Sequence, residues 1–121
     1  MSRTNEARGV AFQVFVSRAP YANLLPEGEK TTFWQDFGIA ERFGMGAVKD
    51  TFERAFKEWR DDVVYLAELA LCLNHKCWQW HGGNDDLSRL YCDLWERVND
   101  YAYGEGNLTE EQVDYYFSIT D

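Results

Sequence analysis

Apolar residues recur at helical spacing along most of the chain after residue 31, and recognisable stop signals separate the runs. Helices are predicted over Thr32–Phe43, Val48–Trp59, Val63–Trp80, Asn84–Gly104 and from Thr109 onward. Capping-box patterns open the first and last helices, and the inner face of the first is predicted to include Phe43 before Gly44 closes it. The apolar phase continues through residues 60–63, so the pattern leaves open whether the second and third helices are separate or one long helix.

The first thirty residues have a different pattern and contain both prolines of the chain. Val10–Val16 is rich in β-branched and aromatic residues, which predicts a short strand. Its best candidate partner is Tyr115–Ile119, while pairing with another chain or with solvent stays open. We therefore predict a mainly α fold: a small bundle of four to five helices over residues 31–121, preceded by an N-terminal extension over residues 1–30 that contains this strand.

Composition limits the class of protein. The chain has 121 residues, of which 45% are hydrophobic, and its net charge is −9. One domain with a real core is expected, and direct binding to nucleic acid is not, because phosphate binding needs clustered Lys and Arg. The longest apolar stretch, residues 63–73, contains Glu68 and is too short to span a membrane. With no secretory leader in the first thirty residues, a cytoplasmic protein is expected.

Four segments of the chain resemble a family of small acidic bacterial proteins that are carried on mobile genetic elements and have no assigned activity. The segments are TTFWQDFGIAERFG (31–44), AVKDTFERAFKEW (47–59), LYCDLWERVNDYA (90–102) and the ending YYFSITD (115–121). The resemblance covers roughly residues 31–121. It implies an anti-defence role of the anti-CRISPR type, in which a small acidic protein inhibits nucleic-acid-handling machinery.

Metal and catalytic chemistry find little support. Cys77 and His81 would share a helix face, whereas Cys72 and His75 would lie on the other side, and no CxxC knuckle is present. The three cysteines, the third of which is Cys92, are therefore expected to be reduced thiols packed as small hydrophobes. Paired carboxylates occur only at predicted helix starts, where they stabilise the helix N-terminus. We expect no metal, no cofactor and no enzymatic activity.

Charge is divided unevenly along the chain. Residues 1–60 contain nine basic and eight acidic residues, whereas residues 61–121 contain three basic and thirteen acidic residues. No basic residue follows Arg97. On the predicted fourth helix, acids recur at seven-residue intervals on the side opposite the apolar stripe, at a spacing comparable with that of phosphates on a nucleic-acid strand.

These observations suggest an interaction protein whose acidic face blocks the basic nucleic-acid-binding groove of a protein partner. Aromatic residues exceed what the apolar stripes can bury, and Trp or Tyr surrounded by charge is typical of interface anchors. The alternatives are a purely solvated acidic face and an accessory module that forms a homodimer or larger oligomer through exposed aromatics or the N-terminal strand. The predicted partner-binding residues are Asp86, Asp93, Trp95, Glu96, Asp100, Tyr103, Glu105, Glu110, Glu111 and Asp114.

Overall fold

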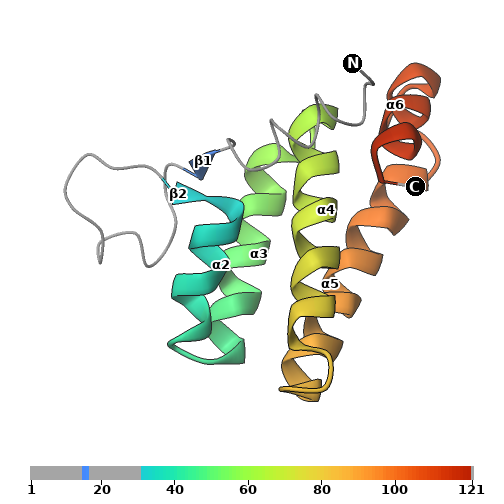
Figure 1. Cartoon of the computed structure of the whole chain (residues 1–121). Coiled ribbons are helices and arrows are strands. Elements are labelled where there is room, and N and C mark those ends of the chain that lie inside the picture. The colour runs from blue at the N-terminus through green and yellow to red at the C-terminus, as the bar shows by residue number, and fades with distance from the viewer. Residues whose placement is uncertain (1–14, 17–30, 121) are drawn as a thin grey trace, which may run out of the picture.

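Five α-helices make up most of the described part of the computed structural model, which covers residues 15–16 and 31–120 (Figure 1). The prediction of a mainly α fold built as a small helical bundle is confirmed. None of the helices in this described part is long and apolar enough to cross a membrane. The helices are α2 (Phe33–Glu41), α3 (Met45–Trp59), α4 (Val63–Trp80), α5 (Asp85–Tyr103) and α6 (Glu110–Thr120).

Helix α4 packs against each of the other four helices. Its largest contact is with α5, which runs antiparallel beside it, while α2 and α3 form a second hairpin (Figure 1). The α2–α3 and α4–α5 turns lie at one end of the bundle, and the α3–α4 turn and α6 lie toward the other (Figure 1). Because α4 is enclosed in this way, every residue from Leu66 to Leu73 is buried, as expected for a helix that is apolar on all sides.

The α3–α4 turn decides between the two interpretations of residues 48–80, since α3 and α4 are separate helices. The backbone N–H of Arg60 donates to the Phe56 carbonyl at the end of α3. Asp62 then adopts an extended conformation, and its carboxylate accepts a hydrogen bond from the Val64 N–H at 3.2 Å. An N-cap of this kind satisfies one of the free donors of the first helical turn, which is why α4 restarts there.

The end of α2 differs from the prediction in two respects. The helix ends at Glu41, and Phe43 is 54% exposed and lies in the turn, not on the inner face. Gly44 has a φ of 104° and occupies the N-cap position of α3, which begins at Met45 and not at Val48. A positive φ of this size is available to glycine at little cost, so Gly44 both ends the turn and begins the next helix.

The N-terminal strand pairs with a different segment from the one expected. Strand β1 (Phe15–Val16) pairs antiparallel with β2 (Thr31–Thr32), and residues 10–14 of the predicted strand lie outside the described residues. The expected partner, Tyr115–Ile119, belongs to α6. A reciprocal capping box explains this helix: the Gln112 N–H donates to Thr109 Oγ1 at 3.2 Å, and the Thr109 N–H donates to Gln112 Oε1 at 2.9 Å.

Candidate functional site

The eight predicted partner-binding acids are all exposed. Four of them lie on α5 because its apolar residues follow one stripe that faces the bundle and leaves the charged positions outside. Glu105 lies in the α5–α6 turn, and the remaining three lie on α6. Neither of the two ion pairs found among residues 15–16 and 31–120 uses any of these eight carboxylates.

The acids on the first half of α5 have basic neighbours. Asp86 and Asp93 line a shallow pocket of about 270 Å³ together with Arg89 of the same helix and Lys49 of α3. Lys49 is far away in sequence, so the spacing of acids along α5 gave no sign of it. This half of the predicted face is therefore of mixed charge and provides a weaker site for a cation than a row of acids alone.

Asp100 has Arg97 three residues earlier on α5, but that guanidinium is paired with Glu53 of α3, and no basic residue follows Arg97 in the sequence. The α3–α4 turn adds two exposed acids to this end, Asp61 and Asp62. Tyr101 of α5 donates to Asp61 Oδ1 at 3.4 Å, and burial, followed by the Asp61 carboxylate, raises the pKa of Tyr101 above its ordinary value. We call this surface the acidic end: Asp61, Asp62, Asp100, Glu105, Glu110, Glu111 and Asp114.

The sequence does not indicate that Asp61 and Asp62 belong to this surface, because acids that precede a helix are already explained as caps of its N-terminus. Helix α6 packs against α4 and α5, and Val63 of α4 lines a hollow of about 320 Å³ with Glu111 and Tyr115 of α6. The start of α4 and the acids of α6 are therefore neighbours. Arg60 in the same turn is a cation that offsets part of this charge.

Of the two predicted aromatic anchors, Tyr103 is exposed and Trp95 is only partly exposed. Tyr103 is 50% exposed, and its ring packs edge-on against the buried Tyr116 at 5.5 Å. Trp95 is half-buried and packs against the core. Phe117 of α6 is 53% exposed. The acidic end therefore carries two exposed rings, Tyr103 and Phe117.

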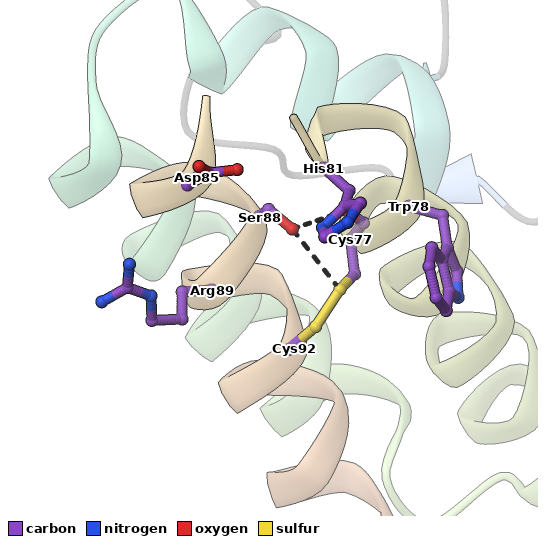
Figure 2. Close-up of a pocket in the computed structure, with 7 residues that line it drawn as sticks. All are labelled: Cys77, Trp78, His81, Asp85, Ser88, Arg89 and Cys92. Carbon is purple, nitrogen blue, oxygen red and sulfur yellow. Dashed lines mark hydrogen bonds between the residues drawn. A yellow bond between two sulfur atoms is a disulfide. The ribbon is translucent and has the colours of Figure 1, made fainter. Parts of the chain in front are cut away.

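The expectation of three reduced thiols is wrong for two of the cysteines. Cys77 of α4 and Cys92 of α5 form a disulfide with Cα atoms 5.4 Å apart, while Cys72 is free and buried. The disulfide borders an open pocket of about 440 Å³ near the α4–α5 turn, here called the disulfide pocket (Figure 2). This Cα separation is within the range that a disulfide requires, and two residues that lie next to each other across an antiparallel hairpin reach it even though they are 15 positions apart in sequence.

A buried polar network joins α2, α4 and α5. Glu41 Oε2 accepts hydrogen bonds from Tyr91 Oη at 2.5 Å and Trp80 Nε1 at 3.1 Å, and it lies 3.2 Å from Lys76 Nζ. The Lys76 ammonium also lies 4.2 Å from the centre of the Trp34 ring. Burial and the bond to Glu41 raise the pKa of Tyr91 above its ordinary value, so its hydroxyl stays a donor. Glu41 Oε2 therefore has three partners from two other helices, which indicates a structural role.

Two buried acids have no hydrogen-bond partner on either carboxyl oxygen, Asp36 of α2 and Glu68 of α4. Burial raises the pKa of Asp36 to about 7 and that of Glu68 to about 9. Burial also raises the pKa of the Cys72 thiol to about 12, which makes it a poor nucleophile. Within residues 15–16 and 31–120, no group of three His, Cys, Asp or Glu side chains is arranged to hold a metal ion.

Comparisons with known proteins add no assignment to this geometry: no family model, no curated protein and no solved structure matches the chain.

Proposed function

We propose that this chain is a non-enzymatic interaction protein whose acidic end occupies the basic nucleic-acid-binding groove of a protein partner and inhibits it. The observation that carries the proposal is the concentration of exposed carboxylates around α6, which come from α5, α6 and the two adjoining turns, in a part of the chain where no basic residue follows Arg97. Binding of such a surface in a cationic groove is electrostatically favourable, because opposite potentials attract and guide association.

The spacing of the acids supports mimicry of a nucleic acid. Glu110 and Asp114 are one helical turn apart, about 6 Å along the axis, which is close to two phosphate steps of a strand, about 7 Å. Helix α6 is held in place because Tyr116 donates to Asn99 of α5 at 2.5 Å and packs its ring against Tyr103. Fixed charges need less ordering on binding than charges on a mobile segment, so a held helix favours affinity.

The two exposed rings support the same surface. Tyr103 and Phe117 lie among carboxylates, and aromatic side chains with a charged surround are frequent energetic anchors of interfaces. Their apolar contribution adds to the electrostatic attraction without depending on salt. An anti-defence role of the anti-CRISPR type, which the resemblance to mobile-element proteins implies, places a nuclease complex among the partners to test.

The experiment is affinity capture of partners from a bacterial lysate at low and at high salt, followed by binding measurements on each captured protein. Asp100→Lys should weaken binding about tenfold or more, whereas Asp93→Lys, one heptad earlier on α5, should weaken it less because Arg89 and Lys49 already offset that region. Both substitutions are exposed and change the charge equally, so they are matched. An affinity that does not change with salt concentration, or equal losses of affinity in the two variants, would contradict the proposal.

A further inference from the structure

The disulfide pocket lies near the α4–α5 turn, and none of the residues that line it belongs to the acidic end. Its lining comprises the two bridged cysteines together with Trp78, His81, Asp85, Ser88 and Arg89 (Figure 2). We propose that this pocket is a thiol–disulfide exchange site, at which an anionic low-molecular-weight thiol reduces the Cys77–Cys92 disulfide in the folded protein. This inference stands independently of the proposed function.

Access determines which sulfur is attacked. Cys77 is only 8% exposed, whereas Cys92 is half-buried and lies on the pocket side of α5. Exchange proceeds by attack of a thiolate on one sulfur of the disulfide, and the rate depends on whether that sulfur can be reached. The incoming thiol therefore attacks Cys92 Sγ, and Cys77 is the leaving group.

The surroundings of Cys77 favour its departure as a thiolate. Ser88 Oγ lies 3.7 Å from Cys77 Sγ and donates to the Cys77 carbonyl at 2.7 Å. Rotation of this hydroxyl turns its proton toward the sulfur once the sulfur becomes negative, and hydroxyl rotors move with little cost. His81, one helical turn after Cys77, lines the same pocket and adds a second donor within it (Figure 2).

The chemical class of the thiol follows from the charges at the pocket. Arg89 is exposed and lies one turn before Cys92 on α5, and its guanidinium points away from the disulfide in Figure 2. Rotation of this long, exposed side chain brings the guanidinium toward a carboxylate of a thiol that approaches Cys92. Asp85 accepts a hydrogen bond from the Gly82 N–H at 2.9 Å and is partly committed to that turn. Trp78, 67% exposed and in edge-on contact with His81 at 5.7 Å, provides an apolar wall. A carboxylate-bearing thiol such as glutathione fits these groups.

The reaction balances without any group beyond the thiol. The first thiolate forms a bond to Cys92 Sγ, the Cys77–Cys92 bond breaks, and its electron pair leaves with Cys77 as a thiolate that takes a proton. A second thiolate attacks the sulfur of the small thiol in this mixed disulfide and releases Cys92. Two thiols are oxidised to one small disulfide, and the protein disulfide is reduced to two thiols.

The test uses the native full-length protein with reduced glutathione at neutral pH, trapped by alkylation and followed by peptide mass spectrometry. Glutathione should be found on Cys92 and the alkyl group on Cys77, while circular dichroism shows that the helices remain folded. A disulfide that glutathione reduces only after denaturant is added would overturn the proposal, as would glutathione found on Cys77.

Charge recognition is tested with a matched pair of variants. Arg89→Gln should slow reduction by glutathione about tenfold but leave reduction by uncharged β-mercaptoethanol unchanged, since only the first carries carboxylates. Arg97→Gln removes the same charge from α5 outside the pocket and should alter neither rate. Equal glutathione rates for Arg89→Gln and the parent protein would overturn recognition of an anionic thiol by this pocket.

Discussion

The buried ion pair between Lys76 and Glu41 allows a quantitative test of how the polar network supports the bundle. The Lys76 side chain is 2% exposed and that of Glu41 is 12% exposed, so each charge depends on the other in place of water. Glu41→Gln leaves the Lys76 charge buried without an ion partner and should lower the free energy of unfolding by about 3–5 kcal/mol. Lys76→Met leaves the carboxylate with its Tyr91 and Trp80 donors and should cost less, about 1–3 kcal/mol.

The double variant Glu41→Gln/Lys76→Met removes both charges, and we expect its loss to be smaller than the two single losses together, with a coupling energy of about 1–3 kcal/mol. Urea unfolding followed by circular dichroism measures all four proteins. The exposed pair between Arg97 and Glu53, about half exposed on both sides, is the matched control, and the same cycle there should give at most about 1 kcal/mol. Single losses that add within about 0.5 kcal/mol at the buried pair would refute the reasoning.

Burial raises the pKa of Asp36 from 3.8 to about 7 and that of Glu68 from 4.5 to about 9. The folded state holds these protons, so the free energy of unfolding is greatest below the unfolded-state pKa values and falls as the pH rises from these through the folded-state pKa values. Glu68→Gln removes this dependence for one group and should therefore raise the urea midpoint at about pH 8 more than at about pH 4. Equal gains at both pH values would contradict this. Reducing the Cys77–Cys92 disulfide, whose sequence separation is 15, should lower the free energy of unfolding by about 3 kcal/mol. Urea titrations with and without reductant measure the loss, and coincident curves would contradict it.

Helix type and position followed from sequence because local signals and the apolar period agree in this chain. The Thr109–Gln112 capping box illustrates the agreement, since both of its hydrogen bonds form and the apolar residues that follow, Tyr116 and Ile119, are buried. Phe43 was misplaced because periodicity cannot tell the last helical residue from the first residue of a turn. Only the backbone conformation at Gly44 makes that distinction.

The disulfide could have been anticipated from the geometry of a hairpin. Cys77 lies three residues before the end of α4 and Cys92 seven residues after the start of α5, so both lie within about two helical turns of the α4–α5 turn, where the two antiparallel helices are close together. The expectation of a reducing compartment led instead to the prediction of three free thiols. No comparable rule would have paired Lys76 with Glu41, because that contact depends on how α2 lies against α4 after the chain has packed.

The position of the other helices also explains why the acidic row on α5 divides into two halves. Around Asp93 the neighbouring element is α3, which contributes Lys49, whereas α6 and the α3–α4 turn at the other end of α5 together hold five exposed acids and one base, Arg60. Like charges gathered at one end of the molecule repel one another and lower the stability of the free protein. A surface that is merely solvated gains nothing from concentrating its charges in this way. A cationic partner relieves this repulsion on binding. Asp100→Lys should therefore leave the free protein at least as stable as its parent while it weakens the complex, and this combination separates a functional surface from a structural one.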